Sequence, residues 1–251
     1  MGQAREFLAE GLAEGQRVLY VGRGDLDVLV RQLCTVRALE DGIGRGAVQV
    51  ASLEATYSSG AVVEPEEQVR RYATATGEAL AAGFTGLRVA ADATPMVRTP
   101  AQLDAFARYE YLVDRFMSTE PMSAMCAYSA AELDDESIAQ LACLHPCASE
   151  GSTPFHLHAG SAGVSASLTG QLDVEARELW PLALERADLR PVDGRVVIDA
   201  SRLEFIDHRS LLALADYAKQ RDMTVVLRTS LSGPAHLLEL LNVIAVRVEQ
   251  M

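Results

Sequence analysis

The sequence predicts an α/β protein with two domains, and three observations support this prediction. Short apolar runs of strand length alternate with stretches of helix length along the 251 residues, which favours mostly parallel strands joined by helices. A chain of this length is sufficient for two ordinary domains. The small, polar segment ASEGSTP at 148–154 contains a proline and is typical of a linker. We therefore predict one domain over residues 1–150 and another over residues 151–251.

The first domain is predicted to alternate regularly between helix and strand. Asp25 or Gly24 suits the N-cap of the second helix, and Pro65 suits the first turn of the third. Pro146 is expected to end the last helix. The predicted strands are residues 17–22, 47–53, 86–91 and 122–128, and the predicted helices are residues 3–14, 25–37, 64–82, 100–118 and 129–144.

The second domain is predicted to begin with strands and to continue with alternating helices and strands. Residues 156–158 and 164–168 are expected to form an antiparallel pair. The helix over 174–187 contains Pro181, which predicts a kink. The other predicted strands are residues 195–199, 224–228 and an edge strand at 244–248, and the other predicted helices are residues 207–219 and 233–241.

The charge and hydropathy of the chain exclude several classes of function. The net charge is −13, and most of the acidic excess lies in the first 154 residues. No basic cluster of the kind that binds phosphate backbones occurs, so we expect no nucleic-acid or anionic membrane partner. No apolar run approaches the roughly 18 residues of a membrane span, and the N-terminus lacks the apolar core of a signal peptide. The sequence therefore predicts a cytoplasmic protein.

The four cysteines leave two interpretations open. They are Cys34, Cys126, Cys143 and Cys147, and in a cytoplasmic chain we expect them to be reduced. The segment CLHPC at 143–147 is similar to half of a zinc site, but no matching second half is evident. Buried or surface thiols are one interpretation, and a metal or redox role is the other. We predict neither a metal nor a cofactor.

Three segments of the second domain carry a resemblance to a known fold. They are LTGQLDVEARELW at 168–180, RVVIDASRLEFIDHRSLLALADYA at 195–218 and MTVVLRTSLSGPAHLLELL at 223–241. In order and spacing they resemble the STAS domain of bacterial anti-sigma-factor antagonists, over essentially all of residues 155–251. The resemblance implies an α/β fold and binding to a protein partner: an anti-sigma factor, a switch-kinase-type protein or another STAS protein.

The turn that carries the phosphorylation site in the resembling proteins is altered here. Asp207 keeps the family's aspartate, whereas His208 and Arg209 replace the two hydroxyl residues and Ser210 replaces a glycine. Three interpretations of Arg209 stay open: an exposed residue of a domain that has lost regulation, a residue that binds an acidic partner, or a shift of the acceptor to Ser210. A shift of one residue turns a helical side chain by about 100°. Asp173 lies at the same expected end of the sheet, and all five are candidate partner-binding residues.

The opening of the first domain is similar to RecA-like ATPases, because FLAEGLAEGQRVLYVG at 7–22 places a helix before a strand. No G-x-x-x-x-G-K-[ST] segment occurs, however, and Lys219 is the only lysine. Without the loop amides and their lysine, a triphosphate would have no binding site. We therefore predict a RecA-like sheet without a phosphate loop, and no ATP hydrolysis.

The first domain resembles the MEDS domain more closely than it resembles RecA-like ATPases. The MEDS domain is the sensory domain of methanogen and methylotroph regulators and of a dichloromethane-responsive repressor. The resembling segments are residues 6–22, 48–72, 78–97, 103–133 and 143–146. The resemblance implies sensing of a ligand that it does not identify. Members of the family usually open with a strand bearing His and Cys, which is absent here.

The candidate ligand-binding residues follow from the expected sheet. In an open α/β sheet, ligands bind beyond the carboxyl ends of the strands, where Arg23, Tyr57, Asp92 and Tyr128 are expected. The two tyrosines would otherwise be packing residues, and Asp92 a cap or turn residue or a degenerate metal-binding acid. No nucleophile–base pair, carboxylate pair or metal cluster can be assembled from the sequence, so we do not expect an enzyme.

Together, the two resemblances predict a non-enzymatic signalling regulator. In this hypothesis a sensory domain is coupled to a STAS module that binds a protein partner and influences transcription without the usual phosphoacceptor serine. One alternative is a scaffold protein that forms homo-oligomers. Another is a small-molecule-binding domain with weak catalytic potential.

Overall fold

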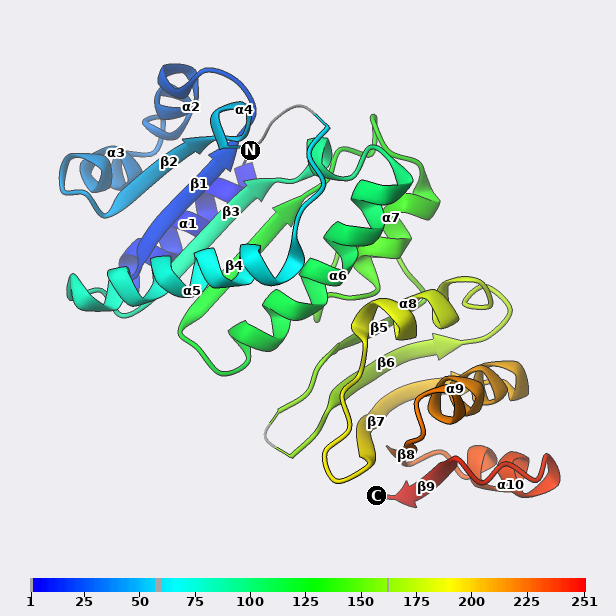
Figure 1. Cartoon of the computed structure of the whole chain (residues 1–251). Helices are drawn as coiled ribbons and strands as arrows, with labels where there is room; N and C mark the ends of the chain where they lie inside the picture. Colours follow the sequence, from blue (N-terminus) through cyan, green and yellow to red (C-terminus); the bar gives the residue numbers. More distant parts are fainter. Residues whose placement is uncertain (1, 57–59, 162) are drawn as a thin grey trace. The chain divides into compact units, whose positions relative to one another are not determined.

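The computed structural model describes residues 2–56, 60–161 and 163–251 (Figure 1). The chain divides into two compact units, and each is described by itself. The first unit comprises residues 1–109 and 119–133, and the second comprises residues 110–118 and 134–251. The predicted α/β class is confirmed, because each unit has its own sheet with helices between the strands. The boundary near residue 150 stays a prediction.

The first unit is built on a parallel sheet with strand order β2-β1-β3-β4. Its strands are β1 (Arg17–Gly22), β2 (Val48–Ser52), β3 (Leu87–Asp92) and β4 (Met122–Ala127). The helices that begin in this unit are α1 (Gly2–Ala13), α2 (Leu26–Leu33), α3 (Arg37–Gly44), α4 (Leu53–Thr56), α5 (Pro65–Ala81) and α6 (Pro100–Met117), with a short 3₁₀ helix η1 (Thr94–Met96). Helix α6 contributes residues to both units.

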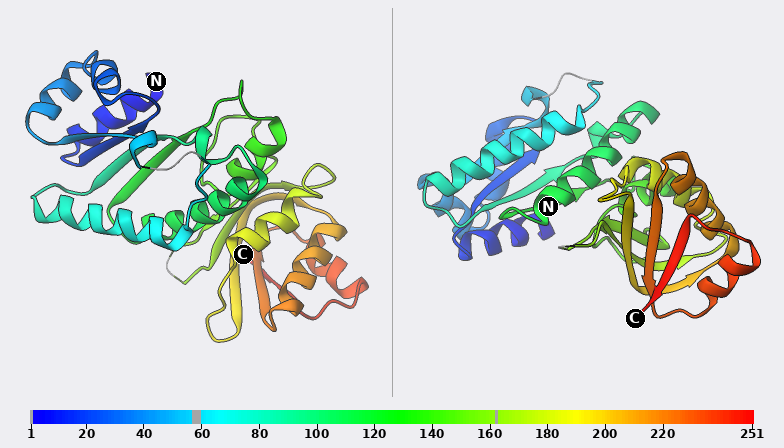
Figure 2. Two further views of the ribbon diagram at one scale, coloured as in Figure 1. Left: turned by 45° about the horizontal axis from the view of Figure 1, so that its top comes forward. Right: turned by 60° about the horizontal axis from the view of Figure 1, so that its bottom comes forward.

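Helices cover both faces of this sheet, as a parallel sheet requires. Helix α1 lies on one face, and α5 and α6 lie on the other (Figures 1 and 2). Leu8 of α1 and Leu39 of α3 are fully buried and belong to one apolar cluster with Val18, Val48 and Ala90 of the strands. The amphipathic helices therefore bury their apolar faces against strands that are themselves apolar.

The second unit contains a mixed sheet with strand order β5-β6-β7-β8-β9. Strands β5 and β6 are antiparallel, and the remaining pairs are parallel. The strands are β5 (Phe155–Ala159), β6 (Ala166–Leu172), β7 (Arg195–Ile206), β8 (Thr224–Thr229) and β9 (Val246–Gln250). The helices that lie wholly in this unit are α7 (Asp135–Ala142), α8 (Leu179–Ala187), α9 (His208–Gln220) and α10 (Gly233–Leu240).

One face of the second sheet is apolar, and α8, α9 and α10 lie on it (Figure 2). Burial alternates along the strands, with Phe155, Leu157 and Ala159 of β5 buried and the two histidines between them half-buried. Strand β6 contains Gly170 with φ +89°, where its register with β7 shifts. A side chain there would collide with the Pro154 carbonyl, so this irregularity requires glycine.

The predicted helices over residues 25–37, 129–144 and 174–187 differ most from the observed ones. The helix predicted over residues 25–37 is shorter, because α2 ends at Leu33. A separate helix that was not predicted, α3, begins at Arg37 after the extended residue Val36. Helix α7 begins at Asp135 rather than at residue 129, because the Asp134 carboxylate accepts a hydrogen bond from the Ser137 N–H at 2.7 Å and caps the helix there.

The predicted kink at Pro181 is wrong. Helix α8 begins only at Leu179, so Pro181 lies in its first turn. The N–H groups of a first turn have no partner within the helix, and the missing N–H of proline disturbs nothing there. Strand β7 is also longer than residues 195–199 and continues to Ile206.

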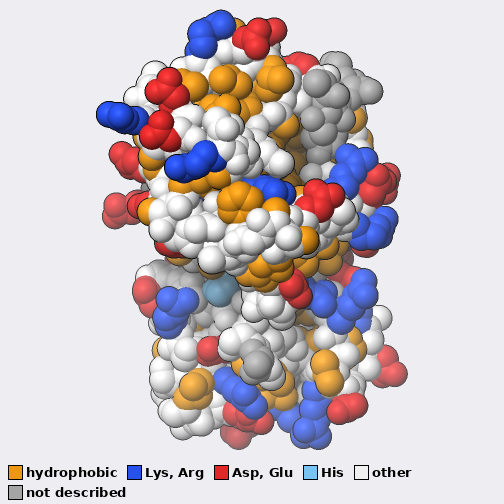
Figure 3. All heavy atoms as spheres, turned by 90° about the vertical axis from the view of Figure 1, so that its left-hand side faces the viewer, with side chains coloured by type: hydrophobic (Ala, Val, Ile, Leu, Met, Phe, Trp, Pro, Cys, Tyr) orange, Lys and Arg blue, Asp and Glu red, His pale blue; other side chains and the backbone are white. Residues whose placement is uncertain are grey.

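Charges of both signs are mixed over the face of the molecule shown in Figure 3, without a large area of one sign. Among the described residues, no helix combines the length and the apolar character that crossing a bilayer requires.

Candidate functional site

The strand order of the first sheet creates a switch point between β1 and β3. The chain passes from β1 to β2 on one side and then returns to β3 on the other side. Ligands of open α/β proteins bind beyond the carboxyl ends of such strands. Arg23 follows β1 directly and Asp92 ends β3, and the Arg23 Nε lies 2.6 Å from the Asp92 Oδ2.

Two arginines at this edge hold one carboxylate. Arg23 Nη1 donates to Glu132 Oε1 at 2.7 Å, and Arg98 Nη2 donates to Glu132 Oε2 at 2.6 Å. Hydrogen bonds from Arg23 and then Arg98 lower the pKa of the Glu132 carboxyl, because both stabilise its ionised form. Each carboxylate oxygen therefore has its own guanidinium partner.

A hollow of about 570 Å³ lies beside these charges. Its lining includes Arg23, Leu53, Glu54, Met96, Arg98 and Gln102. Two of its polar side chains are already engaged. The Glu54 carboxylate accepts from the Gly24 N–H at 2.9 Å, and that hydrogen bond lowers the Glu54 pKa. The Gln102 amide donates to the Ala61 carbonyl at 3.0 Å. The hollow thus combines apolar walls with two arginines.

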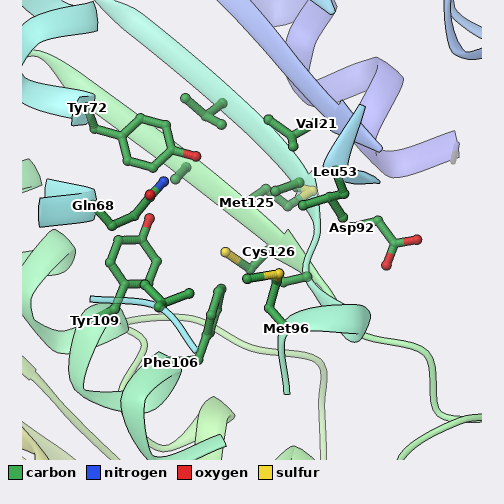
Figure 4. A pocket seen from close by; sticks show the side chains of 15 residues that line it. Val21, Leu53, Gln68, Tyr72, Asp92, Met96, Phe106, Tyr109, Met125 and Cys126 are labelled. Carbon is green, nitrogen blue, oxygen red and sulfur yellow. The ribbon is translucent and has the colours of Figure 1, made fainter. Parts of the chain in front are cut away.

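A second, smaller cavity of about 40 Å³ lies between the sheet and the helices α5 and α6 (Figure 4). It is mostly apolar, with Met96, Phe106 and Met125 in its lining. Figure 4 shows the carboxylate of Asp92 pointing away from the other labelled side chains. A cavity of this size holds a few waters at most, well below the size of pockets for metabolites.

The structure places the four predicted ligand-binding residues in different environments. Arg23 and Asp92 are brought together as an ion pair. Tyr128 is half-buried and packs edge-to-face on Phe106, with ring centroids 6.4 Å apart, as its alternative interpretation as a packing residue predicts. Tyr57 lies outside the described residues.

Sequence reasoning missed Arg98 and Glu132. Both follow strands of the same sheet, because Arg98 comes after β3 and Glu132 after β4. The carboxyl ends of parallel strands meet at one edge, so charged residues in these two turns were a usable signal.

The candidate partner-binding turn lies in the second unit, at the start of α9. Asp207 is the N-cap, and its Oδ1 accepts from the Ser210 N–H at 2.7 Å. His208 and Arg209 are exposed. Asp173 follows β6, whose last residue is in register with the last residue of β7, and it accepts from the Glu175 N–H at 2.9 Å. The turns at Asp173 and Asp207 therefore lie at the same sheet edge.

Ser210 is held inside this turn. Its side chain is buried, its hydroxyl lies 3.4 Å from the Leu172 carbonyl, and its own carbonyl accepts from Trp180 Nε1 at 3.0 Å. A kinase needs an exposed hydroxyl, so this burial weighs against Ser210 as a shifted phosphoacceptor. The exposed residues of the turn are the histidine and the arginine.

Asp207→Ala is expected to lower the free energy of unfolding of the second unit by about 1 kcal/mol, the usual value of an N-cap side chain. The measurement is urea denaturation followed by fluorescence, because the chain has one tryptophan and it lies in this unit. Asp216→Ala is the control, since Asp216 is exposed on the same helix and lies 3.8 Å from Lys219. Equal losses in both variants would contradict the capping role.

The geometry of the first unit defines a class of protein: an open, parallel α/β domain with a hollow of apolar walls and two arginines at its switch point, the position where such domains bind ligands. The profile of the family described as "MEDS: MEthanogen/methylotroph, DcmR Sensory domain" matches residues 1–146. The chain therefore belongs to the MEDS family, and it carries a sensory domain. No curated protein and no solved structure matches the chain.

Proposed function

We propose that this protein is a non-enzymatic cytoplasmic regulator in which the MEDS domain senses a small molecule and the second unit binds a protein partner. The observation that carries the proposal is the family match over residues 1–146. The hollow at the β1–β3 switch point supports the ligand-binding part, because it lies where open α/β sheets bind their ligands.

We further propose that the second unit acts as a STAS-like module whose partner is an anti-sigma factor or a switch-kinase-type protein, and so influences transcription indirectly. The antiparallel hairpin followed by parallel strands is compatible with that resemblance. The strand–Asp–helix arrangement at Asp207 is also kept, and the capped helix presents His208 and Arg209 to solvent. A fixed positive charge there replaces a switchable negative one.

The charge of Arg209 provides the test. The full chain is assayed for binding to purified anti-sigma factors and switch-type kinases from the same genome. Arg209→Glu is expected to weaken the binding of an acidic partner surface at least about tenfold, because like charges then face each other. Lys219→Glu is the matched control, since it reverses the same charge at the other end of α9.

Two outcomes would contradict this function. One is that none of these partners binds the full chain. The other is that Arg209→Glu and Lys219→Glu weaken binding equally, because the α9 turn would then have no special part in recognition.

A further inference from the structure

We infer that the hollow at the switch point binds a small organic acid, whose carboxylate takes the place of Glu132 between Arg23 and Arg98. The inference rests on the sensory role proposed above and names the chemical class of the ligand. Three features carry it: the clamp of two arginines on one carboxylate, the apolar wall beside them and the position of Glu132 in the chain.

The clamp already shows how a carboxylate is recognised. Each Glu132 oxygen accepts one charge-assisted hydrogen bond, at 2.7 Å from Arg23 and 2.6 Å from Arg98. Arg23 is also oriented from behind by Asp92 at 2.6 Å. A ligand carboxylate in the same place would find the Arg23 guanidinium positioned in advance by Asp92, and it would take over the pairing of Arg98 from Glu132.

Glu132 can leave this position, because its side chain is not locked in a core. One third of its side-chain surface is exposed, at 33%, as is a similar fraction of Arg23 at 35% and more of Arg98 at 53%. Exposed ion pairs contribute little net stability, so exchanging one carboxylate for another is not a costly step.

The residues that line the hollow indicate the chemistry of the rest of the ligand. Leu53, Pro95 and Met96 form an apolar wall, whereas Glu54 and Gln102 are already hydrogen-bonded to backbone groups. A ligand with a carboxylate and a short apolar body matches this combination. A second negative charge would approach Glu54 and is disfavoured.

The position of Glu132 connects binding to the following segment of the chain. Glu132 lies in the turn after β4, where its N–H donates to the Ser129 carbonyl at 3.0 Å. Asp134, the N-cap of α7, stands two residues further on. Displacement of Glu132 by a ligand therefore acts on the segment that leads directly into α7.

The experiment measures binding to the full chain by isothermal titration calorimetry. The probes are the straight-chain monocarboxylates from acetate to hexanoate, their uncharged amides and inorganic phosphate. Glu132→Gln is expected to raise the affinity for a monocarboxylate about tenfold, because it removes the competing charge without changing shape. Arg98→Gln is expected to lower it about tenfold or more, since it removes one charge-assisted hydrogen bond.

Arg108→Gln is the matched control, because Arg108 is a half-buried arginine of α6, outside the lining of the hollow, paired with Asp104 four residues before it. It should bind like the wild type. The inference is overturned if the amides bind as tightly as the acids, if only phosphate responds to the variants, or if Glu132→Gln binds none of the acids. Thermal melting of each variant checks that it is folded.

These outcomes are separate from the proposed partner binding. If the full chain binds no monocarboxylate but Arg209→Glu still weakens partner binding, the ligand class is overturned and the partner proposal stands. If the monocarboxylate binds as expected but Arg209→Glu has no special effect on partner binding, the partner proposal is overturned and the ligand site stands.

Discussion

Trp180→Ala is expected to lower the free energy of unfolding of the second unit by about 3–5 kcal/mol, the usual range for removing a buried aromatic side chain. Trp180 is 1% exposed and lies in α8. Its ring meets Phe155 edge-to-face with centroids 5.5 Å apart, and its Nε1 donates to the Ser210 carbonyl at 3.0 Å. The alanine variant loses the buried area, the ring contact and the hydrogen bond together.

The measurement is urea denaturation followed by circular dichroism, because the variant has no tryptophan left to fluoresce. Trp180→Phe is the control and should lose only about 1–2 kcal/mol, since it keeps a ring but leaves the Ser210 carbonyl without this donor. The Ser210 carbonyl lies in the first turn of α9, so both variants are also expected to weaken the partner binding that we propose for the Asp207 turn. A loss below about 1 kcal/mol in Trp180→Ala would contradict the central packing role.

Glu110→Gln is expected to destabilise the second unit by about 3 kcal/mol near pH 6.5 and to remove most of its pH dependence between about 6.5 and 9. Glu110 is 3% exposed, and its Oε2 lies 3.2 Å from Nε2 of His145. His145 Nδ1 faces the Leu141 carbonyl at 2.9 Å. Both ring nitrogens therefore face acceptors, which only the charged imidazolium satisfies fully.

The sign of the pH effect follows from the pKa of His145. Burial opposes its charge, but the charge and hydrogen bond of Glu110 outweigh that and raise the pKa to about 9. Because the folded pKa lies above the ordinary value, this stabilisation is complete below about pH 6.5 and is lost as the pH rises through about 9. Burial also raises the pKa of the nearby Asp114 to about 6, so that group finishes its titration at lower pH.

The measurement for Glu110→Gln is urea denaturation at several pH values, followed by the fluorescence of Trp180. Glu178→Gln is the control, because Glu178 is 97% exposed and should leave the pH profile unchanged. An unchanged slope between pH 6.5 and 9 in Glu110→Gln would show that the pair does not hold the charge of His145.

Much of the first unit could be predicted from local sequence. Residues 17–22 were predicted as a strand and form β1 with the same ends, and α5 begins at Pro65 as expected. These elements are apolar over a full strand length, or carry their own start signal, and need no distant contact to be recognised. The helix predicted over residues 207–219 was likewise found close to its observed start at His208.

The candidate site was only half predictable. Arg23 and Asp92 were found because each follows or ends a recognised strand, whereas Glu132 lies 109 residues from Arg23 and 34 from Arg98. The sequence pattern predicts where the strands lie along the chain but not their order in the sheet. That order decides which turns become neighbours.

The sequence by itself determined the α/β class, most strands and helices, and the absence of a phosphate loop, because these depend on residues close together in the chain. Only the tertiary structure decided that α2 ends at Leu33 and a separate helix α3 follows it, that Ser210 is buried and that two arginines share Glu132. Each of these features depends on packing between segments that are distant in the sequence. Whether a hydroxyl is buried or a charge is paired depends on which residues the fold places against it, and a local sequence pattern does not predict those residues.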